Sequence, residues 1–120
     1  MEPIQFNVKE RKTKVILPES LGFGKYFTDH MFSMDYNQTD GWHNPIIHPV
    51  ESLPVHPASM FIHYGQAVFE GLKAFKQKSG DIVIFRPDKH FERLNNSSRR
   101  ICIPEVDVEF VMDADRKSVV

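Results

Sequence analysis

The segment from His63 to Phe75 constrains the fold most, because the period of its apolar residues changes at a glycine. Upstream of Gly71, apolar and aromatic residues recur every three or four positions, which is the spacing of one helical face. Downstream, residues 72–76 combine aliphatic, aromatic and lysine side chains and suit a short strand. The pattern predicts a buried helix that runs through Gly71 into a strand, with the rest of the chain packed around this joint. The predicted helical face consists of Phe61, Tyr64, Gly65, Val68 and Phe69.

A pair of strands is predicted before this joint. Residues 26–36 alternate at period two and are rich in aromatic residues, which is typical of a strand. Residues 37–41 end in Asp-Gly, a dipeptide that favours a tight turn. Residues 42–48 then form the returning strand, which Pro49 stops.

The N-terminal residues have a different character. Residues 1–20 are polar and lysine-rich without a sustained period, so we expect an N-terminal arm that is either mobile or an edge segment. Gly22 and Gly24 predict a turn directly after this arm. Residues 21–120 are then expected to form one small domain.

A hairpin and two helices are predicted after the joint. Residues 77–81 form a loop that can fold the strand at 72–76 onto residues 82–85, a continuous β-branched run typical of a strand buried on both faces. Pro87 favours the start of a helix that continues to Cys102.

A further helix is expected over residues 106–120, because apolar residues recur there at near-helical spacing. Pro104 separates it from the preceding helix, and Pro57 is well placed to open the helix of the joint. This order of elements predicts an α+β fold with a small, largely antiparallel sheet and helices packed against it.

Composition excludes several classes of function. The formal net charge of −1 argues against a nucleic-acid or anionic-membrane partner, since both require a basic surface. Cys102 is the only cysteine, so no internal disulfide can form and a reducing compartment fits best. No apolar run approaches the roughly 20 residues that span a bilayer, and the N-terminus lacks the apolar core of a signal peptide. We therefore expect a cytoplasmic protein.

Arg93 is the first candidate for a functional residue. It lies within a predicted helix that follows a predicted buried strand, and from there a guanidinium can bind a phosphate. The spacing alone favours the simpler interpretation, a solvated arginine that pairs with a nearby acid.

The other candidates also have simpler interpretations. Tyr64 and Phe69 could line a pocket, but an aromatic stripe at helical spacing is more often core. Glu70 is expected to be a buried acid tied to backbone or to a lysine, and Cys102 to be buried and inert. No metal site is expected, because the histidines lack a metal-ligand spacing. These histidines include His30, His43, His48 and His63.

Several segments in the same order resemble the branched-chain amino acid aminotransferases, which are fold-type IV enzymes that use pyridoxal phosphate. The resemblance extends from Phe23 to Pro104. The longest match favours this family over D-amino-acid aminotransferases and aminodeoxychorismate lyase, which share its features more loosely. The matching segments are His56–Ser59, His63–Phe75 and Phe85–Leu94, with Thr28–Met31 and Gly41–Trp42 in support.

The resemblance implies roles for four residues. Arg93 corresponds to the arginine that holds the cofactor phosphate. Phe23 and Phe69 correspond to aromatic residues that line the pocket for the branched side chain. Tyr64 corresponds to a tyrosine that reaches the active site of the partner subunit, which implies a homodimer. The implied substrates are branched-chain amino acids and 2-oxo acids.

The resemblance also implies that part of the active site is missing from these residues. In the family, the Schiff-base lysine, the acid facing the pyridine nitrogen and the substrate-carboxylate contacts follow in a later domain. No lysine in this chain has the matching context, so no catalytic residue is assigned. We expect an N-terminal small domain that is inactive alone. A non-catalytic dimerisation or binding module is the alternative of a different class.

Overall fold

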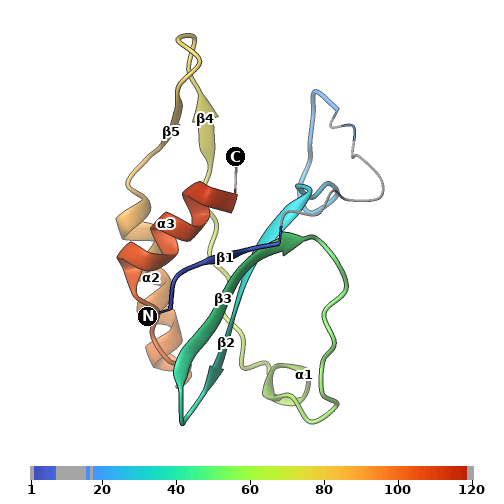
Figure 1. Ribbon diagram of the computed structural model, residues 1–120, viewed down its shortest axis with the longest axis vertical. Coiled ribbons are helices and arrows are strands. Elements are labelled where there is room, and N and C mark those ends of the chain that lie inside the picture. Colours follow the sequence, from blue (N-terminus) through green and yellow to red (C-terminus); the bar gives the residue numbers. More distant parts are fainter. Residues whose placement is uncertain (1, 8–15, 17, 119–120) are drawn as a thin grey trace. The chain divides into compact units, whose positions relative to one another are not determined.

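The computed structural model describes residues 2–7, 16 and 18–118 (Figure 1). Residues 8–15 and 17 of the expected arm, and residues 119–120 of the last expected helix, lie outside this set. The chain divides into two compact units, one of residues 1–53 with 114–120 and one of residues 54–113. The elements are β1 (Gln5–Phe6), β2 (His30–Asn37), β3 (Gly41–Pro49), α1 (Met60–Tyr64), β4 (Ala74–Lys76), β5 (Ile82–Ile84), α2 (Pro87–Arg100) and α3 (Val108–Ser118).

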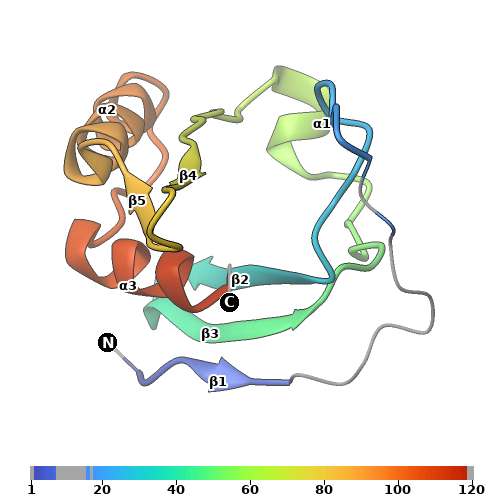
Figure 2. The ribbon, with the colours of Figure 1, turned by 90° about the horizontal axis from the view of Figure 1, so that it is seen from above.

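The first unit contains a three-stranded sheet with β3 at its centre (Figure 2). β2 pairs with β3 in antiparallel orientation, as the sequence predicts, and β1 pairs with the other edge of β3 in parallel. Ile47 lies opposite Phe6 on one side and Phe32 on the other, and is only 2% exposed. The expectation of an edge segment in the arm is confirmed for β1.

The turn between β2 and β3 is held by the side chain of Asn37. Its Oδ1 accepts hydrogen bonds from the backbone N–H groups of Thr39 and Asp40, at 2.9 and 2.8 Å. Gly41 follows with a φ of 68°, a conformation that strongly favours glycine. The Asp-Gly signal therefore predicts the reversal correctly.

The predicted buried helix of the central joint is wrong in length and in burial. α1 has five residues, none of them buried, and ends at Gly65, whose φ of 62° is left-handed. Gly65 therefore ends the helix six positions before Gly71, since the left-handed conformation is the common helix stop for glycine. Residues 66–73 have no regular secondary structure and connect α1 to β4.

The second unit contains the predicted hairpin of β4 and β5, paired in antiparallel orientation. Gly80 in its turn has a φ of 96°. The prediction that the second strand is buried on both faces is wrong, because Ile82 and Val83 are exposed. With one neighbour only, the run of β-branched residues reflects strand propensity and not two-sided burial.

α2 begins as predicted, with Pro87 in its first turn. It ends at Arg100, earlier than the predicted Cys102, and Cys102 is exposed with a φ of 59°. The expectation that Cys102 is buried is therefore wrong. Asn95 ties α2 to the segment before α3, because its amide donates to Val106 O at 2.8 Å and accepts from Val106 N at 2.9 Å.

α3 begins after Asp107, whose Oδ1 accepts a hydrogen bond from Phe110 N at 2.9 Å. The predicted α+β class with largely antiparallel strands is confirmed, with the strands divided between two sheets. Among the described residues, no helix has the length and apolar character needed to cross a membrane.

Candidate functional site

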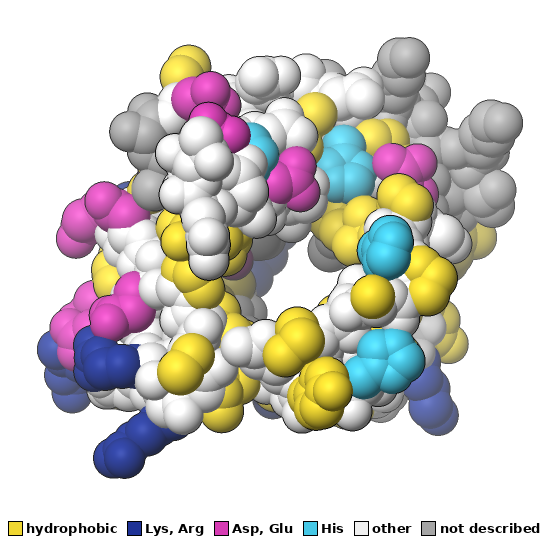
Figure 3. Space-filling view, turned by 90° about the horizontal axis from the view of Figure 1, so that it is seen from below, with side chains coloured by type: hydrophobic (Ala, Val, Ile, Leu, Met, Phe, Trp, Pro, Cys, Tyr) yellow, Lys and Arg dark blue, Asp and Glu magenta, His cyan; other side chains and the backbone are white. Residues whose placement is uncertain are grey.

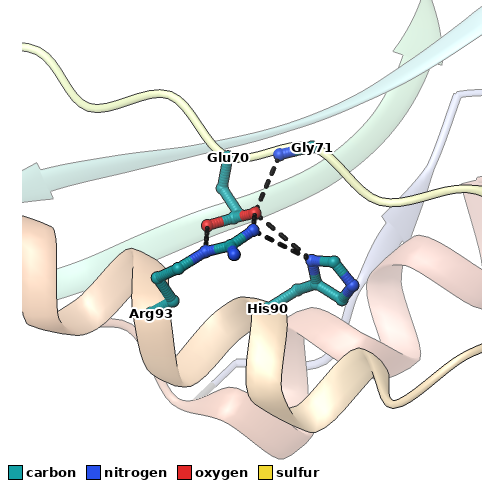
Figure 4. A network of polar contacts seen from close by, with 4 residues as sticks. All are labelled: Glu70, Gly71, His90 and Arg93. Carbon is teal, nitrogen blue, oxygen red and sulfur yellow. Dashed lines mark hydrogen bonds and ion pairs between the residues drawn. The ribbon is translucent and has the colours of Figure 1, made fainter.

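Glu70 and Arg93 form a bidentate ion pair in the second unit (Figure 4). Arg93 Nε donates to Glu70 Oε2 at 2.7 Å, and Arg93 Nη2 donates to Oε1. The Gly71 backbone N–H donates to the same carboxylate at 3.1 Å, and His90 Nδ1 lies 3.2 Å from Oε1. These four residues, Glu70, Gly71, His90 and Arg93, are called the Glu70 cluster below.

The Glu70 carboxylate is ionised at any ordinary pH. The hydrogen bonds from Arg93 lower the pKa of Glu70 to about 2, and those from His90 and Gly71 act in the same direction, while burial opposes them. The same contact raises the pKa of Arg93. The cluster therefore holds a fixed carboxylate against a fixed guanidinium.

The sequence offers two interpretations of Arg93, a phosphate ligand and an arginine paired with a nearby acid. The simpler one, a pair with a nearby acid, is confirmed, and the acid is Glu70. The expectation that Glu70 contacts backbone is also confirmed, at Gly71, although its side-chain partner is an arginine and not a lysine. His90 also belongs to this contact, and its spacing of three from Arg93 places both residues on one face of α2.

The pair with Glu70 leaves part of the guanidinium available. Arg93 uses Nε and Nη2 toward Glu70, and Nη1 makes no hydrogen bond with any residue that the structure describes. The Arg93 side chain is 64% exposed, whereas the Glu70 side chain is 10% exposed. A planar guanidinium with one edge occupied can still offer N–H groups on its outer side to an anion.

Arg93 also lines a small hollow, together with four neighbouring residues. It has a volume of about 160 Å³ and is called the basic hollow below. Three of its five lining residues are lysine or arginine, a charge that suits a phosphate group. Lys89 also pairs with Glu92 at 2.6 Å, so part of this charge is compensated. The lining residues are Phe85, Arg86, Lys89, His90 and Arg93.

The aromatic candidates are exposed even more than the Arg93 side chain, which is 64% exposed. Phe23 is 86% exposed, Tyr64 77% and Phe69 80%. Hydrophobic side chains reach the surface on the face drawn in Figure 3, where they are coloured yellow. The predicted pocket wall of Phe23, Tyr64 and Phe69 therefore stays a prediction.

Metal chemistry has no support in the described part of the chain. No group of three or more histidine, cysteine, aspartate or glutamate residues is placed there to hold a metal ion. His48 is buried, with its Nε2 2.9 Å from the Ser33 hydroxyl and its Nδ1 3.3 Å from Glu51. This arrangement joins β2 to β3 and the residues that follow.

The chain is similar in sequence to several aminotransferases. It is 53% identical to "Branched-chain-amino-acid transaminase 1" of Bacillus subtilis over 97 residues, which are 81% of this chain and 27% of that protein. It is 45% identical to "Probable branched-chain-amino-acid aminotransferase" of Staphylococcus epidermidis over 118 residues, 98% of this chain and 33% of that protein. A Mycolicibacterium smegmatis protein, "Branched-chain-amino-acid aminotransferase", is 45% identical over 98 residues, 82% of this chain and 27% of its own length. No protein-family profile matches the chain.

The chain thus spans between about a quarter and a third of the length of these relatives. The similarity covers most of the present residues, including the Glu70 cluster and the basic hollow within the second unit.

Proposed function

This chain is a homologue of the branched-chain-amino-acid aminotransferases over most of its own length, and we propose that it is the small N-terminal domain of such an enzyme. The proposed domain comprises residues 21–120, preceded by an arm of residues 1–20. The whole enzyme then transfers an amino group between leucine, isoleucine or valine and 2-oxoglutarate, in the synthesis or degradation of branched-chain amino acids. The names and the identity of the relatives support this proposal.

The proposed cofactor is pyridoxal phosphate, and Arg93 is proposed to bind its phosphate. The single observation that carries this assignment is the exposed Arg93 side chain, which lines the basic hollow. A phosphate needs charge-assisted hydrogen bonds to stay bound through turnover, and a guanidinium supplies them in a planar array. When bound, the cofactor supplies the electron sink for the chemistry at the amino acid Cα.

The proposed substrate wall consists of Phe23 and Phe69, with Tyr64 directed toward the active site of a partner subunit in a homodimer. Burial of an aliphatic side chain against such residues contributes about 0.8 kcal/mol per methylene, which is enough to select branched side chains over small ones. The high exposure of all three side chains is compatible with residues that are covered by substrate, by a second domain or by a partner. A cytoplasmic location is part of the same proposal.

The residues of this chain account for binding and not for proton transfer. No lysine here is assigned to the Schiff base, so the proton transfers at Cα are proposed to depend on residues outside these 120. We therefore expect no transaminase activity from the 120-residue chain with cofactor, leucine and 2-oxoglutarate. Turnover by the purified chain would contradict this expectation.

A chimera tests the proposed activity. In this protein the 120-residue chain replaces the matching stretch of the Bacillus subtilis relative, to which it is 53% identical over 97 residues. We expect the folded chimera to form glutamate from L-leucine and 2-oxoglutarate, with the parental relative as the control for both folding and activity.

A panel of amino donors separates the alternatives. A folded, cofactor-loaded chimera that uses D-alanine in preference to L-leucine would favour a D-amino-acid aminotransferase. A chain that forms dimers but supports no cofactor binding in the chimera would favour a non-catalytic dimerisation module. Either result would overturn the proposal.

A further inference from the structure

The two members of the central ion pair differ strongly in their surroundings. The Glu70 side chain is 10% exposed and the Arg93 side chain 64% exposed. Glu70 also has donors other than Arg93, namely the backbone N–H of Gly71 and the ring of His90. The carboxylate is therefore the fixed partner, and the arginine is the one that it holds.

The contact between them fixes the plane of the guanidinium. Nε and Nη2 donate to different oxygens of the carboxylate, which is the side-on bidentate arrangement of an arginine and an acid. Because the guanidinium is planar, two such bonds leave no rotation about its own long axis. The remaining nitrogen, Nη1, is then directed away from Glu70, while Nη2 also lies 3.4 Å from His90 Nδ1.

We infer that Glu70 is a positioning residue for anion binding, which holds the Arg93 guanidinium so that its free edge serves the basic hollow. The inference rests on the proposed role of Arg93 toward the cofactor phosphate. The negative charge of Glu70 by itself would weaken the binding of an anion at a neighbouring site, because like charges repel.

The two roles of Glu70 predict opposite changes in phosphate affinity when its charge is removed. If Glu70 only anchors its own segment to α2, removal of its charge should leave phosphate binding unchanged or make it tighter, since repulsion is lost. If Glu70 positions Arg93, removal of the charge should weaken phosphate binding in spite of the lost repulsion. In that case, the orientation of Arg93 contributes more to phosphate binding than the repulsion by Glu70 removes.

The experiment titrates the 120-residue chain with pyridoxamine 5′-phosphate by calorimetry. This probe carries the phosphate but no aldehyde, so it does not form Schiff bases with surface lysines. Pyridoxamine without the phosphate is the ligand control. Glu105→Gln is the matched protein control, because Glu105 accepts an equivalent pair of hydrogen bonds from Arg99 Nε and Nη2 and does not line the basic hollow.

We expect Glu70→Gln, which keeps the reach but removes the charge, to weaken binding by about 3- to 10-fold, the effect of one charge-assisted hydrogen bond partly replaced by a neutral one. Glu70→Asp, which keeps the charge but shortens the reach, should weaken binding as well. Neither substitution should have a further effect in an Arg93→Ala background. Unchanged or tighter binding by folded Glu70→Gln and Glu70→Asp variants would overturn the inference.

The Arg93 Nε–H signal in nuclear magnetic resonance gives a readout without ligand. Glu70→Gln should speed its exchange with water, whereas an unchanged signal would contradict the positioning role even if binding is altered. Different results would contradict the proposed role of Arg93 in phosphate binding. These results are an unchanged affinity for pyridoxamine 5′-phosphate in Arg93→Ala, or no binding by the wild-type chain. The Nε–H signal would still test the contact between Arg93 and Glu70.

Discussion

The charged and the aromatic candidates for the active site are organised in different ways. Arg93 has its orientation fixed by a bidentate contact with Glu70 inside one compact unit. Phe23, Tyr64 and Phe69 have side chains that are at least 77% exposed. The charged residues of the proposed site are thus oriented by contacts among themselves, whereas the aromatic side chains of its proposed apolar half are largely exposed.

The difference follows from the kind of interaction. An ion pair with several hydrogen bonds can be completed by neighbouring residues of one helix and one adjoining segment. An apolar pocket must be enclosed on all sides before it excludes water, and no single short segment encloses a ligand. A part of an enzyme can therefore position a charged group before it can form a hydrophobic pocket.

The largest effect is expected for Arg93→Ala in the chimera. Loss of the proposed phosphate contact should lower kcat/KM for leucine by about 10- to 100-fold, the usual effect of a hydrogen-bonded charge on binding. Excess cofactor should restore part of the activity, and absorbance of the bound cofactor measures its occupancy. Arg100→Ala, at an exposed arginine of the same helix, is the control and should retain activity. Equal losses in both variants would remove the special role of Arg93.

Asn95→Ala should destabilise the chain by about 1–3 kcal/mol, because it leaves both backbone groups of Val106 without their partner. The measurement is urea denaturation followed by circular dichroism. Asn96→Ala is the matched control, since exposed Asn96 only accepts a hydrogen bond from Arg99. A loss no larger than that of the control would show that the contact between Asn95 and Val106 does not stabilise the second unit.

The contribution of Glu70 to stability should depend on pH. Its pKa is about 2 in the folded chain and 4.5 as the unperturbed value. Between these values the unfolded chain binds the proton first, so the stabilisation is present above about pH 4.5 and is lost as the pH falls toward 2. Glu70→Gln should remove this part of the acid dependence. An identical pH profile for the variant and the wild type would contradict the structure of the Glu70 cluster.

The smallest effect on stability is expected for Phe69→Ala, less than about 1 kcal/mol in the 120-residue chain, because the side chain is 80% exposed. Phe91→Ala, at a half-buried phenylalanine of α2, should cost more. In the chimera, by contrast, Phe69→Ala should raise KM for leucine. A large loss of stability for Phe69→Ala would show that the aromatic half is also formed within this chain.

The strands and the start of α2 could be predicted from sequence, because their signals are local. Alternation at period two, the Asp-Gly turn and Pro87 each act within a few residues. The helix of the central joint could not be predicted correctly, because periodicity includes Gly65 in the helical face and places the break at Gly71. Only backbone conformation shows that Gly65 adopts the left-handed state that ends α1.

The candidate site could also be predicted only where its signals are local in the sequence. Sequence reasoning selects Arg93 and recognises Glu70 as an acid with a backbone partner. Their pairing joins positions 23 residues apart in the chain, and no local pattern predicts such a contact. Burial of Cys102 and of β5 was also misjudged, since composition reports that a residue is apolar and not what covers it.

The most direct test of the proposed phosphate site follows the Arg93 side-chain signals of the labelled 120-residue chain during titration with pyridoxamine 5′-phosphate. We predict saturable shifts of the guanidinium signals that pyridoxamine without phosphate does not produce, while the Nε–H contact with Glu70 persists. Shifts of equal size with both compounds, or loss of the Nε–H signal as phosphate binds, would contradict the claim that Glu70 holds Arg93 ready for the phosphate.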